Sequence, residues 1–120
     1  MMRPVAKVLI CEPHPEVREL LGRVVTRLGH EPLHDDAELS RVDAIVLEPA
    51  HAPSVERAAA FRAVDQATPV VCASIEVPHA GSRMLAPIAY LVKPFALPDL
   101  EHALCRALNG NGKHSRPVAL

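Results

Sequence analysis

Aromatic residues are almost absent from this sequence. Phe61, Tyr90 and Phe95 are the only phenylalanine and tyrosine residues among 120, and there is no tryptophan. Proteins that hold single-stranded nucleic acid stack its bases on exposed aromatic rings, so this mode of recognition has little support here. The core must be aliphatic, because hydrophobic residues still make up 49% of the chain.

An excess of positive charge is also missing. The chain has 13 lysine and arginine residues against 14 aspartate and glutamate residues, which gives a net charge of −1. Binding to phosphate backbones depends on a basic surface. We therefore expect no direct contact with nucleic acid.

Long apolar runs are lacking as well. No stretch approaches the roughly 20 apolar residues that a membrane-spanning helix needs. The N-terminal sequence MMRPVAKVLI has neither the apolar region nor the cleavage site of a signal peptide. The expected location is the cytoplasm, without membrane contact.

Cysteine is scarce, and its spacing matches no common metal-binding pattern. Cys11, Cys72 and Cys105 lie far apart, and no Cys-x-x-Cys pair occurs. An odd number of separated cysteines in apolar surroundings predicts reduced thiols buried in the core. Neither a disulfide nor a structural zinc site is expected.

Five short apolar runs predict β-strands, over residues 5–11, 31–34, 43–47, 69–74 and 88–92. Pro32 lies in the second run and places it at an edge of the sheet, where proline is tolerated. Strands that are apolar along nearly their whole length are typical of a parallel sheet covered by helices on both faces.

Helical patterns separate these runs. The first covers 15–28 after Pro15, and its apolar stripe is Val17, Leu20, Leu21, Val24, Val25 and Leu28. Residues 35–41 leave room for barely two helical turns. Ser54 can cap a helix over 55–66. Residues 76–88 predict only a short or irregular helix.

A last helix carries Asp99 and Glu101 in its first turn, where they complement the helix dipole. Its apolar stripe is Leu100, Ala103, Leu104, Ala107 and Leu108. The alternation of elements predicts one α/β domain over residues 1–110, followed by a flexible tail at 111–120.

Polar side chains follow four of the predicted strands. Glu12 comes after the first, Glu48 after the third, Ser74 at the end of the fourth and Lys93 after the fifth. The carboxyl ends of parallel strands share one edge, which is where open α/β sheets bind ligands. We therefore expect two carboxylates, a hydroxyl and an amine to converge there.

The segment YLVKPFALPDL, residues 90–100, gives this arrangement a family resemblance. Lys93 and Pro94, with Tyr90 three residues before the lysine, resemble the switch region of the receiver domains of two-component response regulators. Ser74 matches their strand-end hydroxyl. The resemblance covers about residues 5–109 and implies a flavodoxin-like (βα)5 fold, a doubly wound parallel sheet with strand order 2-1-3-4-5.

In that family an aspartate after the third strand accepts a phosphoryl group from a histidine kinase, and two acidic residues after the first strand help to bind Mg²⁺. Here Glu48 stands at the phosphoacceptor position. Glu12 matches the first acid, but Pro13 replaces the second and has no side-chain oxygen. We expect Mg²⁺ binding to be weak or lost, because Mg²⁺ demands near-ideal octahedral oxygen geometry.

These departures predict an atypical receiver without enzymatic activity or cofactor, in which Glu48 pairs with Lys93 and accepts a hydrogen bond from Ser74. Signalling would then proceed through protein contacts with a histidine kinase or an output protein. The resemblance also implies a homodimer through the fourth helix, fifth strand and fifth helix. Pro78, Gly81 and Pro87 erode that fourth helix.

Four alternatives compete with this interpretation. One is an enzyme that uses Glu12, Glu48 and Lys93, but the sequence offers no credible nucleophile–base pair. Glu48 could be phosphorylated despite its extra methylene. A flavodoxin-like protein binding a small ligand would need a glycine-rich phosphate loop, which CEPHPE lacks. His14 and His51 could join Glu12 and Glu48 in a metal site, although solvated loop histidines are the simpler explanation.

Overall fold

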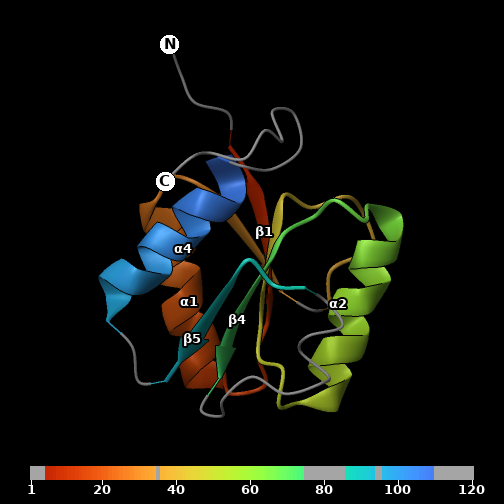
Figure 1. Cartoon of the computed structure of the whole chain (residues 1–120), viewed down its shortest axis with the longest axis horizontal. Coiled ribbons are helices and arrows are strands. Elements are labelled where there is room, and N and C mark those ends of the chain that lie inside the picture. The colour runs from red at the N-terminus through yellow and green to blue at the C-terminus, as the bar shows by residue number, and fades with distance from the viewer. Residues whose placement is uncertain (1–4, 35, 75–85, 94–95, 110–120) are drawn as a thin grey trace.

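The computed structural model describes residues 5–34, 36–74, 86–93 and 96–109, and it contains a five-stranded parallel sheet (Figure 1). The strand order is β2-β1-β3-β4-β5, as predicted. The strands are β1 (Lys7–Cys11), β2 (Glu31–His34), β3 (Ala44–Leu47), β4 (Val70–Ser74) and β5 (Ala89–Val92). The chain therefore has the predicted single flavodoxin-like α/β fold.

Helices cover both faces of the sheet (Figure 1). Helices α1 (Pro15–Arg27) and α4 (Leu97–Asn109) pack on one face, and α2 (Ala52–Val64) packs on the other. The pleat divides β1 between two cores: Val8 and Ile10 join the α1–α4 side, whereas Leu9 joins the α2 side. Burial on both faces explains why the strand sequence is almost entirely apolar.

The two-turn helix predicted for residues 35–41 is wrong. Between β2 and β3 the described residues, 36–43, form turns and bends without a helix. Ala37 packs on the α2-side core, but Leu39 is half exposed, so the segment has too few buried apolar residues to fix an amphipathic helix. Arg57 of α2 donates a hydrogen bond to the Ala37 carbonyl and holds the segment in place.

Helix α2 begins earlier than predicted. His51, not Ser54, is the N-cap residue, and its ring Nδ1 accepts a hydrogen bond from the Ser54 amide at 3.3 Å. The buried Ser54 hydroxyl bonds the same nitrogen at 2.8 Å. A histidine is not among the usual capping residues, which is why the sequence pointed to the serine.

Two residues expected in the core lie at the surface. Leu20 was assigned to the apolar stripe of α1 but is 41% exposed, whereas Leu21, Val24 and Val25 are buried. Cys105 is exposed because it lies on α4 away from the buried side of that helix. Cys11 and Cys72 are buried as predicted.

This difference among the cysteines gives a direct prediction. Burial, together with the negative charge of Glu48, raises the pKa of the Cys72 thiol to about 12. The thiolate is the reactive form, so folded protein at pH 8 should be alkylated by iodoacetamide at Cys105 only. Mass spectrometry should show one adduct on folded protein and three in denaturant. Rapid labelling of Cys72 without denaturant would contradict this burial.

Several sequence predictions fall outside the described residues. Most of the irregular helix over 76–88 and the tail at 111–120 belong to this group. None of the helices within the described ranges combines the length and the apolar character needed to cross a bilayer.

Candidate functional site

Four strands deliver the predicted polar side chains to one edge of the sheet. Glu12 follows β1 directly, Glu48 follows β3, Ser74 is the last residue of β4, and Lys93 follows β5. Backbone hydrogen bonds fix these ends relative to one another: the Glu48 amide donates to the Cys11 carbonyl at 3.0 Å, and the Lys93 amide donates to the Ser74 carbonyl at 2.6 Å. The sheet itself therefore sets the spacing of the site.

Lys93 lies between the two carboxylates. Its Nζ is 2.7 Å from Oε1 of Glu12 and 3.0 Å from Oε1 of Glu48. The side chains of Glu12, Glu48 and Lys93 are only 2%, 4% and 13% exposed. The predicted Lys93–Glu48 contact is present, and these three residues form a nearly buried ionic triad.

The remaining carboxylate oxygens also have hydrogen-bond donors. Oε2 of Glu12 accepts from the His14 amide at 3.1 Å and lies 2.8 Å from His14 Nδ1. Oε2 of Glu48 accepts from the Ala50 amide at 2.9 Å, and the Ser74 hydroxyl bonds the same carboxylate. Within the described ranges, no buried side-chain nitrogen or oxygen lacks a partner.

These contacts decide the charge state of Glu48. Burial raises the pKa of its carboxyl group, but the hydrogen bonds from Ser74, Ala50 and Lys93 and the charge of Lys93 outweigh burial, so the pKa falls below its ordinary value of 4.5. Glu48 is consequently an anion at neutral pH, held by donors that favour the charged form.

The donor set fits a resident Mg²⁺ ion poorly. Pro13, half-buried beside Glu12, contributes no side-chain oxygen, and a cation entering the triad would compete with Lys93 for the same two carboxylates. Among the residues whose positions are described, no cluster of three or more His, Cys, Asp and Glu side chains could hold a metal.

The histidines at this edge separate into two environments. His14 approaches Glu12, as the alternative metal site would require. The His51 ring instead turns to Ser54, and the His51 amide donates to the Glu48 carbonyl at 3.3 Å. The two rings therefore do not combine with both carboxylates in the way that the alternative metal site requires.

Two further predicted positions lie partly or wholly outside the described structure. Tyr90 lies in β5 opposite Cys72 of β4, but its side chain is outside the described part of the structure, and so is Pro94. Their predicted switch roles stay predictions.

Two contacts were missed by sequence reasoning. The pairing of Lys93 with Glu12 had no local signal, because 81 residues separate them along the chain. The Ala50 amide could have been anticipated, since Pro49 turns the chain directly after the acid and points a following N–H back toward it.

No family model and no curated protein sequence matches this chain. Solved structures do match. Chemotaxis protein CheY4 of Vibrio cholerae is 22% identical with a TM-score of 0.74, and the match covers 88% of this chain and 100% of that one. A response regulator from Thermotoga maritima is 14% identical with a TM-score of 0.71, covering 88% and 99%.

A third match is the receiver domain of a sensor histidine kinase from Pseudomonas aeruginosa, which has a magnesium ion coordinated in its active site cleft. It is 18% identical, with a TM-score of 0.72 over 88% of this chain and 99% of that chain. The protein is thus a flavodoxin-like α/β domain. Within that class, its fold is that of the response-regulator receiver domains.

Proposed function

We propose that this chain is an atypical receiver module that signals through protein contacts, without phosphorylation of Glu48. The observation that carries the proposal is the bridge formed by Lys93 between Glu12 and Glu48, at 2.7 and 3.0 Å. In the receiver domains that this chain resembles, the corresponding lysine contacts the phosphoryl group. Here it already has two buried anionic partners.

The geometry of the acceptor position supports the same proposal. Glutamate carries its carboxylate about 1.5 Å farther from the backbone than aspartate does, by one carbon–carbon bond. Displacements near 1 Å can slow an aligned reaction about a hundredfold. The site also lacks the second acid, because Pro13 takes its place. An acceptor without a well-held metal loses the charge neutralisation that phosphoryl transfer depends on.

The triad would instead hold the module in one state. Glu48 supplies about one negative charge where an aspartyl phosphate would supply nearly two, so any resemblance to an activated receiver is partial. The proposal includes a histidine kinase or an output protein as partner, a cytoplasmic location, no enzymatic activity, and weak or absent Mg²⁺ binding. It includes no contact with nucleic acid.

The proposal also includes a homodimer through the face that contains β5 and α4. Val92 of β5 is 45% exposed and Ile88, just before the strand, is 37% exposed, which leaves apolar surface along this edge of the sheet. Sedimentation velocity over a range of concentrations tests this part. A monomer at every concentration would contradict it.

Phosphorylation is tested with acetyl phosphate. The purified chain, incubated with acetyl phosphate and Mg²⁺, should show no added phosphoryl mass, because Lys93 and the missing acid leave Glu48 unreactive. A receiver with an aspartate acceptor and an intact acidic pair, treated in parallel, shows that the reagent works. One phosphoryl group on the wild type that Glu48→Gln abolishes would support the divergent phosphorylated receiver and contradict our proposal.

A further inference from the structure

Strand β5 is an edge of the sheet that lacks the usual protection. It pairs with β4 on one side and stands last in the strand order. The open side of an edge strand attracts other strands, and proteins commonly blunt it with proline or charged side chains. Residues 88–92, IAYLV, contain neither. The sequence therefore leaves this edge suited to pairing with another strand.

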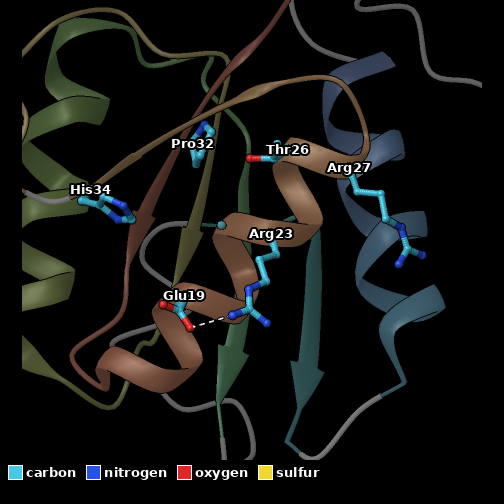
Figure 2. Close-up of a pocket in the computed structure, with 7 residues that line it drawn as sticks. Glu19, Arg23, Thr26, Arg27, Pro32 and His34 are labelled. Atoms are coloured by element: carbon cyan, nitrogen blue, oxygen red, sulfur yellow. Dashed lines mark hydrogen bonds and ion pairs between the residues drawn. The ribbon is translucent and has the colours of Figure 1, made fainter.

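The opposite edge, β2, is blunted in two ways. The Glu31 amide donates inward to the Ala6 carbonyl at 2.8 Å, so the nitrogen of Pro32 lies on the open side of the strand (Figure 2). Proline has no N–H to offer there. The His34 carbonyl already accepts a hydrogen bond from the Ala37 amide at 3.0 Å. Of the two edges, β5 is thus the one that can extend the sheet.

The backbone groups on the open side of β5 follow from the ladder to β4. The Lys93 amide donates inward to the Ser74 carbonyl at 2.6 Å, where this ladder ends. Backbone amides alternate in direction along a strand, so those of Val92 and Tyr90 point away from β4. A partner strand would meet these two N–H groups first.

The side chains of β5 alternate between the two faces of the sheet. Ala89 and Leu91 pack on the core beneath α1 and α4. Ile88 and Val92 point to the other face, where α2 packs on β1 and β3, and they are 37% and 45% exposed. Two apolar side chains therefore flank Tyr90, each two residues away from it and on the same face.

This symmetry about Tyr90 favours a second copy of the chain over an unrelated strand. If two β5 strands pair antiparallel with a two-fold axis at Tyr90, the two Tyr90 residues exchange their N–H···O=C bonds. Ile88 of each copy then lies opposite Val92 of the other, so an apolar cross-strand pair forms on both sides of the axis. Donors meet acceptors, and no charged side chain of residues 88–92 meets its like.

We propose that two copies of the chain pair through β5 in this register and join their five-stranded sheets into one. The inference rests on the homodimer of the proposed function and specifies how the two copies bind. Because Lys93 follows β5 directly, the pairing also holds the strand end that carries the lysine of the ionic triad.

The test uses single variants of the full chain and their mixtures, measured by sedimentation velocity. Ile88→Lys and Val92→Glu should each raise the Kd of the dimer by about tenfold or more, because both symmetric apolar pairs are lost. An equimolar mixture of the two should dimerise at least about threefold more tightly than either variant alone. In the mixed dimer the new lysine faces the new glutamate at one pair, and the native apolar pair remains at the other.

Two controls accompany the mixture. Leu39→Lys changes a leucine that is 52% exposed between β2 and β3, and it should dimerise like the wild type. A mixture of Ile88→Lys with Ile88→Glu should stay as weak as its components, because equal positions do not face each other in this register. Tight dimers in this second mixture would contradict the register.

Hydrogen exchange of the wild type gives a measurement that needs no variant. The Tyr90 and Val92 amides should exchange more slowly at concentrations where the chain is dimeric, whereas the His34 amide on the β2 edge should not change. Unchanged exchange at Tyr90 and Val92 in a dimeric sample would overturn the strand pairing.

The outcomes separate this inference from the proposed function. A dimer that Ile88→Lys and Val92→Glu leave intact would overturn the β5 pairing and keep the homodimer. A wild type that is monomeric at every concentration would overturn both. The acetyl phosphate assay reports on Glu48 in either case, so the proposal of a receiver without phosphorylation is tested separately.

Discussion

Replacing Lys93 with methionine should lower the free energy of unfolding at pH 7 by about 3–5 kcal/mol, the usual cost of removing one partner from a buried ion pair. Methionine keeps much of the length of the side chain but removes its charge. Glu12 and Glu48, only 2% and 4% exposed, would then lie beside each other with no cation between them. Because these carboxylates are buried, water cannot solvate their charges as it solvates those of an exposed pair.

The effect of Lys93→Met should depend on pH in a defined direction. In the wild type the folded pKa of Glu48 is lowered, so its charge stabilises the fold above about pH 4.5 and the benefit is lost as the pH falls through the folded pKa. Without Lys93, two of the contributions that lower this pKa are gone, its hydrogen bond and its charge. In Lys93→Met, Glu48 is therefore protonated at a higher pH than in the wild type. The difference in the free energy of unfolding between wild type and variant should consequently become smaller from pH 7 to pH 4.

Urea unfolding of both proteins at the two pH values measures this gap. Lys7→Met, at an exposed lysine of β1, is the matched control and should change stability by less than about 0.5 kcal/mol. Adding Glu12→Gln and Glu48→Gln to Lys93→Met should restore much of the loss, because no buried charge then lacks a counter-ion. Equal stability of Lys93→Met and wild type at pH 7 would show that the triad is not a structural element.

The parts of this molecule that sequence reasoning predicted are those with local signals. Each strand is a short apolar run with a polar residue at its end, and parallel strands bring such ends to one edge whatever the details of packing. That is why the positions of Glu12, Glu48, Ser74 and Lys93 followed from the sequence, together with the edge position of β2.

The parts that failed depend on side-chain choices between distant segments. The pattern of residues 35–41 allows two helical turns, but contacts such as the one from Arg57 to the Ala37 carbonyl hold the segment in another form. Cys105 looked apolar in sequence, yet helix geometry turns it away from the core. The contact of Lys93 with Glu12 depends on the conformation of the Lys93 side chain, which no spacing in the sequence encodes.

Substituting aspartate for both Pro13 and Glu48 should strongly increase phosphoryl transfer from acetyl phosphate to this position. Glu48→Asp withdraws the carboxylate by about 1.5 Å, which weakens its contact with Lys93 and returns it to the position of the family's acceptor. Pro13→Asp adds an oxygen ligand beside Glu12. Together they supply the aligned nucleophile and the acidic pair that hold Mg²⁺ in receivers, so the labelling rate should rise by about a hundredfold or more over the wild type.

The single variants separate the two causes. Glu48→Asp alone should bind Mg²⁺ poorly, because Pro13 still offers no side-chain oxygen, and Pro13→Asp alone should bind Mg²⁺ without efficient phosphorylation. Isothermal titration with Mg²⁺ and intact mass after acetyl phosphate treatment measure the two steps, and thermal unfolding confirms that each variant is folded. If the folded double variant binds Mg²⁺ no better than the wild type, Pro13 and Glu48 do not account for weak Mg²⁺ binding. The remaining cause would then be Lys93, whose ion pairs with Glu12 and Glu48 keep a metal ion away from both carboxylates.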